Sequence, residues 1–147
     1  MAFVAGPAAL LNYKTEDALD DYGYVMMLNT STGNAKKHDG SAVRPLGIAL
    51  QSTESKFSPG TYESNVYVAI QYTGIALVKL SSSNSAITIG DYIGPVTGGV
   101  ADKLTLDTTD ASSLLDSLKK VIGIALESKA ENAGGHIKVL LLLGGGV

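Results

Sequence analysis

Two histidines, His38 and His136, are the side chains of this sequence whose ordinary pKa suits acid–base or metal chemistry near neutral pH. His38 stands in a polar turn, and His136 follows the glycine pair at 134–135. Neither lies at metal-ligand spacing from the other histidine, or from a carboxylate on an element expected to be rigid. We therefore interpret both as ordinary exposed residues. A small β-barrel enzyme, the alternative, would need one of them to meet a carboxylate in a pocket.

Carboxylates are densest at Glu16, Asp17, Asp20 and Asp21, where several oxygens could coordinate a hard cation such as Ca²⁺. Their spacing does not match an EF-hand loop, which favours a solvated acidic stretch instead. The chain has no cysteine, so disulfides, thiolate metal sites and thiol nucleophiles are excluded. The motifs of nucleotide-binding loops and of serine hydrolases do not occur either. We therefore predict no enzyme activity, no catalytic residue, no bound metal and no cofactor.

The net charge of −3 and the pI near 5.2 argue against nucleic-acid binding, which needs a basic surface to displace counterions. The most apolar run, residues 137–143, is far shorter than the roughly 20 residues of a membrane-spanning helix. Its pattern is typical of a strand that is buried on both faces. The N-terminus lacks the basic opening of a secretory signal. We expect a soluble protein with no nucleic-acid or membrane partner.

Short strands separated by turns are the elements that the composition predicts. The apolar residues are mainly Val, Ile, Leu, Ala and Tyr, and 17 glycines interrupt them. Strands are expected at 22–28, 44–50, 66–72, 75–80, 87–96, 100–104, 122–127 and 137–143. One short helix is expected near 109–120, with Thr109 or Asp110 as its N-cap. Four apolar residues would share one face of this helix: Leu114, Leu115, Leu118 and Val121.

An internal repeat is the most informative feature of the sequence. The segment 45–52, PLGIALQS, matches 121–128, VIGIALES, and each copy has a related strand upstream and a Val/Ile-rich strand downstream. A shorter echo, GIAL, stands at 74–77. A unit that is used twice can pack its apolar faces into one small core. We therefore predict an all-β barrel or sandwich with two related halves, at about 20–72 and 89–143.

Residues 1–19 differ from the β domain that is expected to follow at 20–147. They show no sustained alternation, and we interpret them as an extended N-terminal arm that becomes ordered by contact with other molecules. A frayed terminus is the alternative. The apolar residues of this arm are the predicted contacts with other subunits and with a larger assembly: Phe3, Val4, Pro7, Leu10, Leu11 and Tyr13.

Three short motifs suggest a family. They are a Gly-x-Ala strand at 74–76, an Ile-x-x-Gly-Asp turn at 87–91 and a Gly-x-Ala-Leu-Glu strand at 123–127, followed by a last strand from Ile137. With these motifs the chain resembles the small decoration, or cement, proteins of tailed-phage heads that have the β-tulip fold, and their uncharacterised relatives. The resemblance covers about residues 43–143, and the helical insertion departs from the simplest members of that family.

This resemblance implies a β-tulip-like homotrimer that binds the major capsid protein on the outer surface of the virion. Such a protein has no enzymatic role and stabilises the shell by bridging the seams between capsid subunits, where trivalent attachment multiplies the apparent affinity. A fibre or spike module that binds a host surface or a carbohydrate is the alternative function. Its candidate ligand-facing aromatic residues are Tyr62, Tyr67 and Tyr72.

Overall fold

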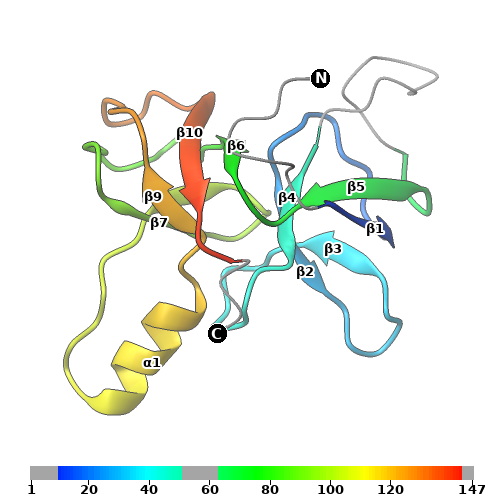
Figure 1. Cartoon of the computed structure of the whole chain (residues 1–147), viewed down its shortest axis with the longest axis horizontal. Coiled ribbons are helices and arrows are strands. Elements are labelled where there is room, and N and C mark those ends of the chain that lie inside the picture. The colour runs from blue at the N-terminus through cyan, green and yellow to red at the C-terminus, as the bar shows by residue number, and fades with distance from the viewer. Residues whose placement is uncertain (1–9, 51–62, 144–147) are drawn as a thin grey trace.

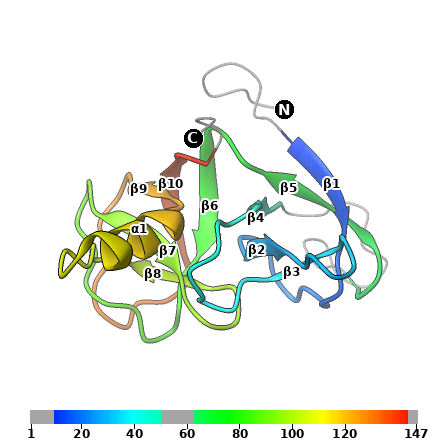
Figure 2. The same cartoon turned by 90° about the horizontal axis from the view of Figure 1, so that it is seen from below.

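The computed structural model describes residues 10–50 and 63–143, in which ten strands form two five-stranded antiparallel sheets (Figure 1). The first sheet contains β1 (Leu10–Lys14), β2 (Val25–Leu28), β3 (Ala35–Lys37), β4 (Gly47–Ala49) and β5 (Tyr67–Gln71). The second contains β6 (Ile75–Lys79), β7 (Tyr92–Pro95), β8 (Ala101–Lys103), β9 (Gly123–Ala125) and β10 (His136–Leu141), and the helix α1 (Ala111–Lys119) connects β8 to β9. The two sheets lie side by side (Figure 2).

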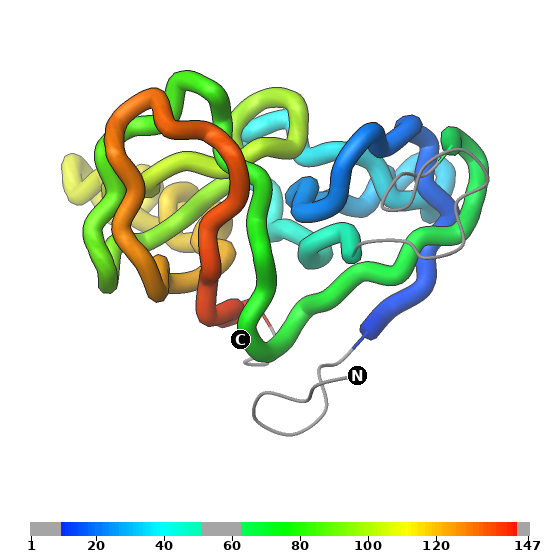
Figure 3. The backbone as a smooth tube through the Cα atoms, turned by 90° about the horizontal axis from the view of Figure 1, so that it is seen from above, coloured from blue at the N-terminus to red at the C-terminus, as the bar shows by residue number. Residues whose placement is uncertain are grey.

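The two sheets have the same strand order. The first is β1-β5-β4-β2-β3 and the second is β6-β10-β9-β7-β8, so each strand of the first sheet has a counterpart five strands later. We call β1–β5 the first unit and β6–β10 the second unit; the chain passes from one to the other between β5 and β6 (Figure 3). The sequence repeat is therefore a duplication of a whole five-stranded unit, which confirms the predicted all-β fold.

Equivalent residues of the two units make equivalent backbone hydrogen bonds. The Gly23 N–H donates to the Ala49 carbonyl at 2.8 Å, and the Gly90 N–H donates to the Ala125 carbonyl at 2.9 Å. Both glycines have a positive φ, +90° and +95°. Because the match extends to single hydrogen bonds, residues 21–25 of the first unit can be compared one by one with residues 88–92 of the second.

Two hydrophobic cores lie side by side, and they are not separate. The first core belongs to the first unit and includes Met26, Val68 and Ile70. The second core is built mainly from the second unit, but Val25 and Ile48 of the first unit are fully buried in it. The two units therefore pack on each other as one body.

The first unit begins earlier than the sequence suggested. β1 lies within the predicted arm of residues 1–19, and the echo at 74–77 is the beginning of β6, its counterpart. Leu11 and Tyr13 pack against the first core, and this packing draws the segment into the sheet. Among the described residues, the β structure therefore begins with β1 and not at residue 20.

The helix α1 begins after Asp110, whose side chain accepts a hydrogen bond from the Ser113 N–H at 2.7 Å. This confirms one of the two predicted N-caps. Leu115 and Leu118 on the predicted apolar face are 54% and 48% exposed, whereas Ser117 is buried. The Ser117 hydroxyl accepts a hydrogen bond from the Asp107 N–H at 3.0 Å, which ties the helix to the segment before it, and two leucines remain at the surface. In the described part of the chain no helix is long and apolar enough to span a membrane.

Candidate interaction surface

Three of the six residues that were expected to contact other molecules lie on β1. Leu11 and Tyr13 are half-buried against the first core, whereas Leu10, on the other face, is 48% exposed. Among the described residues, β1 is the edge strand of the first sheet and pairs with β5 on one side only. It therefore presents an open backbone edge beside partly exposed apolar side chains. Outside the described residues lie the other three, Phe3, Val4 and Pro7.

The four clustered carboxylates do not converge on one point. Glu16 accepts hydrogen bonds from Asn29 and Thr32 in the turn between β2 and β3. The other three each have a different donor: the Lys37 backbone N–H for Asp17, the Tyr24 hydroxyl for Asp20 and the Lys79 ammonium group for Asp21. Among the described residues no group of three or more such side chains could hold a metal ion. These carboxylates instead fasten local segments of the fold.

His136 lies where the two units meet, and its side chain is only 20% exposed, which corrects the expectation of an exposed residue. Its ring stacks on Tyr22 with the centroids 4.1 Å apart, and its Nε2 is 3.4 Å from the Asp21 carboxylate. The same carboxylate receives the Lys79 ammonium group at 2.6 Å. His136 therefore meets a carboxylate, as the enzyme hypothesis required, but that carboxylate already pairs with a lysine. We call this contact between β6, His136 and residues 21–25 the junction.

His38 is fully buried, which corrects the expectation of an exposed residue. Its Nε2–H donates to the Val43 carbonyl at 2.8 Å, and its Nδ1 accepts from the Gly40 N–H at 3.0 Å. A ring that donates through one nitrogen and accepts through the other is neutral. Burial lowers the pKa of His38 below its ordinary value of 6.5, although the hydrogen bond to Val43 opposes this shift. The Gly99 N–H of the second unit donates to the His38 carbonyl, so the residue supports the contact between the units.

Acid is expected to destabilise the fold through His38. Because its pKa is lower in the folded chain, the unfolded chain takes up a proton first as the pH falls below about 6.5, and the free energy of unfolding decreases from there. The slope for one proton is at most about 1.4 kcal/mol per pH unit. Urea unfolding at a series of pH values measures it. His38→Gln should lack this slope and His136→Gln should keep it; equal slopes in the two variants would contradict the assignment.

The outer face of the second sheet carries a row of apolar side chains. Ile75, Leu140, Ile124 and Tyr92 are cross-strand neighbours on β6, β10, β9 and β7. Leu140 and Tyr92 are 39% and 40% exposed. Residues alternate between buried and exposed along β10, so the strand that was expected to be buried on both faces is buried on one. We call these four residues the apolar row.

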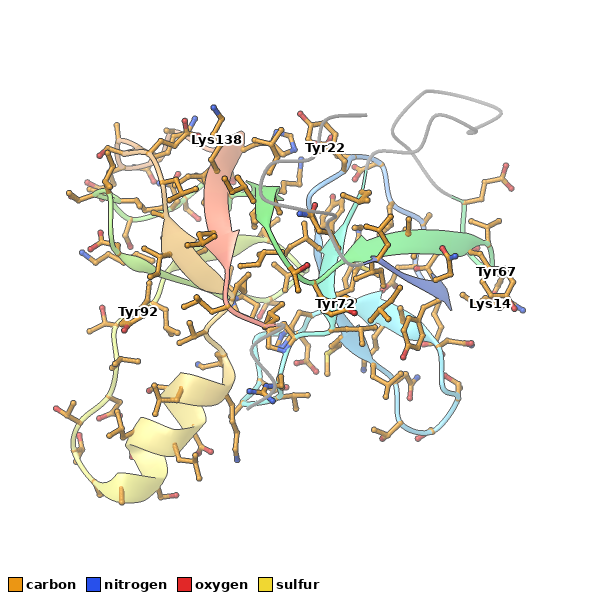
Figure 4. All side chains as sticks on the ribbon, in the orientation of Figure 1. Lys14, Tyr22, Tyr67, Tyr72, Tyr92 and Lys138 are labelled. Carbon is orange, nitrogen blue, oxygen red and sulfur yellow. The ribbon has the colours of Figure 1, made fainter. Side chains whose placement is uncertain are left out.

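Of the tyrosines that were considered as a carbohydrate platform, the two described ones do not lie together. Tyr67 is 72% exposed at the start of β5, whereas Tyr72 is partly buried just beyond the end of that strand (Figure 4). Tyr62 lies outside the described residues. Tyr67 and Tyr72 therefore do not form one aromatic platform (Figure 4).

Comparison with known proteins identifies a structural relative. No family model and no curated protein matches the sequence. The crystal structure of the N base of the head fiber protein gp8.5 of bacteriophage phi29 matches with a TM-score of 0.57 and 14% sequence identity, over 92% of this chain and 94% of that chain. The two chains share a fold. Because the match covers nearly the whole of this chain, the shared fold includes both units.

Proposed function

We propose that this chain is a structural protein of a tailed-phage head, which binds the outer surface of the major capsid lattice as a homotrimer and stabilises the shell. The observation that carries the proposal is the fold shared with the base of a phage head fiber over 92% of the chain. The motifs that resemble phage decoration proteins support the same class of protein independently of the structure.

The exposed apolar side chains support a role in assembly. Leu140 and Tyr92 of the apolar row are exposed, and further large apolar side chains of the second unit are exposed with them: Leu77, Ile89, Val96, Leu126 and Leu142. Leu77 and Leu140 share the outer face of the neighbouring strands β6 and β10, and apolar side chains exposed together in this way favour a protein partner. This exposure supports contact of the chain with other subunits.

Attachment at several points would allow so small a protein to hold a shell together. A trimer that contacts several capsid subunits at once separates from the lattice only when all its contacts break, so modest individual contacts give a high apparent affinity. The net charge of −3 would also keep the protein from binding the phosphates of the packaged DNA.

The proposal is tested by adding the purified chain to phage heads that lack it. We expect the chain to sediment with the heads up to a fixed number of copies per particle, and to raise the temperature at which the heads release their DNA. An unrelated acidic protein of similar size serves as the control. A chain that stays in the supernatant and leaves the release temperature unchanged would refute the proposal.

The second candidate is a module of a head fibre that binds a host surface or a carbohydrate. It is favoured by the fact that the structural relative is the base of a head fiber. Binding of the chain to bacterial surface glycans on an array, with loss of binding in Tyr67→Ala, would support this function over that of a decoration protein.

A further inference from the structure

The junction is covered on both of its sides, whereas the backbone surfaces that correspond to it in the other unit are uncovered among the described residues. At the junction, the Lys79 N–H of the edge strand β6 donates to the Gly23 carbonyl at 2.8 Å. A Cβ added to Gly23 would lie 2.8 Å from the Lys79 nitrogen. A Cβ added to the equivalent Gly90 would have no atom within 4 Å, although the two glycines share φ and hydrogen bonding. The second unit thus presents the same backbone surface with nothing docked on it.

The first unit in turn has an unused copy of the strand that makes the junction. Lys14 pairs with Tyr67 as Lys79 pairs with His136, so β1 is the counterpart of β6 residue by residue. In both sheets this pair lies between ladder hydrogen bonds, so the lysine N–H points to the free edge of the strand. At β6 that edge is occupied by Gly23, and at β1 no described residue occupies it.

The side chains at these positions are likewise covered at the junction and exposed in the other unit. At the junction Tyr22 stacks on His136. Their counterparts are Ile89, which is 64% exposed, and Tyr67, which is 72% exposed, and these are the two most exposed large apolar side chains of the described residues. Such exposure has a simple explanation if each is the missing partner of the other.

The burial of side chains on β6 and β1 agrees with this difference between the two units. Ala76 and Val78 on the inner face of β6 are buried, whereas their counterparts on β1, Leu11 and Tyr13, are only half-buried. On the facing segment, Val25 is fully buried and its counterpart Tyr92 is 40% exposed. Each surface that the junction covers is therefore open in the other unit.

We propose that a second copy of this chain occupies these surfaces: β1 of one copy docks on residues 88–92 of the next, as β6 docks on residues 21–25 within the chain. Lys14 and Tyr67 lie at one end of the molecule and Tyr92 lies on the opposite side, so a chain cannot close this contact on itself (Figure 4). The contact is head-to-tail and generates a closed ring if its rotation closes. This proposal rests on the proposed function, because that function already expects several copies of the chain to assemble.

A glycine turn supplies a further point of contact. Gly99 of the second unit, at φ +77°, accepts a hydrogen bond from the Val25 N–H and donates one to the His38 carbonyl. Its counterpart in the first unit, Gly33, has φ +76° and open space around it. The Gly33 carbonyl of one copy would accept a hydrogen bond from the Tyr92 N–H of the next copy, as the Gly99 carbonyl accepts one from the Val25 N–H within the chain.

Site-specific crosslinking tests the contact, since the natural chain has no cysteine. Ile89→Cys and Tyr67→Cys are made in separate chains, mixed, and treated with a short bis-maleimide. We expect a crosslinked dimer in the mixture and little in either variant alone. Leu115→Cys mixed with Tyr67→Cys is the control, because Leu115 on α1 is 54% exposed, close to the 64% of Ile89. A mixture that crosslinks no more than this control would overturn the proposal.

A charge pair tests the same contact with opposite signs. Asp21 binds Lys79 at the junction, and its counterpart in the second unit is Thr88, which would face Lys14 of the next copy. Thr88→Asp should strengthen association up to about fivefold, and Thr88→Lys should weaken it by a similar factor. Analytical ultracentrifugation measures both. Equal effects of the two variants, or a chain that is monomeric at every concentration, would overturn the head-to-tail contact. A monomer that still binds heads would leave the rest of the proposed function standing.

Discussion

Gly123→Ala is expected to destabilise the fold by about 3 kcal/mol or more, because the added methyl group would meet a backbone atom. A Cβ at Gly123 would lie 2.0 Å from the Leu140 carbonyl oxygen, and a Cβ at the equivalent Gly47 would lie 2.5 Å from the Gln71 carbonyl oxygen. No side-chain rotation relieves such a contact, so β9 and β10 would have to separate. Urea unfolding followed by circular dichroism measures the loss.

Gly98→Ala is the control for this prediction. Gly98 has φ +89° and no atom within 4 Å of an added Cβ, so its substitution costs only the backbone strain of about 1–2 kcal/mol. If Gly123→Ala lowers the free energy of unfolding no more than Gly98→Ala does, the close approach of β9 to β10 is not the reason that position 123 requires glycine. The same glycine at position 47 in the other unit shows that the approach belongs to the duplicated fold.

The duplication could be predicted because the residues that repeat in the sequence are ones that the fold requires at those positions. The Gly-Ile-Ala segments at 47–49 and 123–125 keep a glycine where two strands approach closely and an alanine in the core. The other counterparts are not similar in sequence: Leu11 corresponds to Ala76, and Tyr22 corresponds to Ile89. Sequence comparison therefore detects the central strand of each unit and loses the edges.

The strands β1 and β3 were missed for physical reasons. β3 has three residues, of which Lys36 and Lys37 are charged, and its place in the sheet depends on pairing with β2 and on the burial of Ala35. β1 has only five residues, and the sequence around it shows no sustained alternation. Strand formation at such positions is decided by neighbours that are distant in sequence, which local propensity does not register.

The interaction surface was the part least accessible from the sequence. Residues 137–143 are apolar at successive positions, and this pattern is the same whether both faces of the strand are covered within the chain or one face awaits another molecule. The exposure of Leu140 and Tyr92 decides between these cases. The predicted contact residues Leu10, Leu11 and Tyr13 did fall on the strand that we propose as one side of the contact, although they were assigned to an arm.

The difference in stability between Gly23→Ala and Gly90→Ala should measure how much the junction contributes to the stability of the fold. Both glycines have φ near +90°, so each substitution costs about 1–2 kcal/mol of backbone strain. At Gly23 the methyl group would also meet the Lys79 nitrogen at 2.8 Å and the Leu77 carbonyl oxygen at 2.9 Å, which adds about 2 kcal/mol. Urea unfolding of dilute, monomeric protein should therefore show the larger loss for Gly23→Ala.

Assembly of the chains should reveal an effect of Gly90→Ala that the stability of the monomer does not show. In the monomer, Gly90→Ala adds a methyl group in open space. In a head-to-tail ring, that methyl group would meet the edge of β1 in the next copy as the Gly23 methyl group meets β6. Gly90→Ala should therefore impair association while it leaves the monomer nearly as stable as Gly98→Ala does. Equal stability of the Gly23 and Gly90 variants as monomers would show that the junction does not hold the units together, and the inference drawn from it would fail with it.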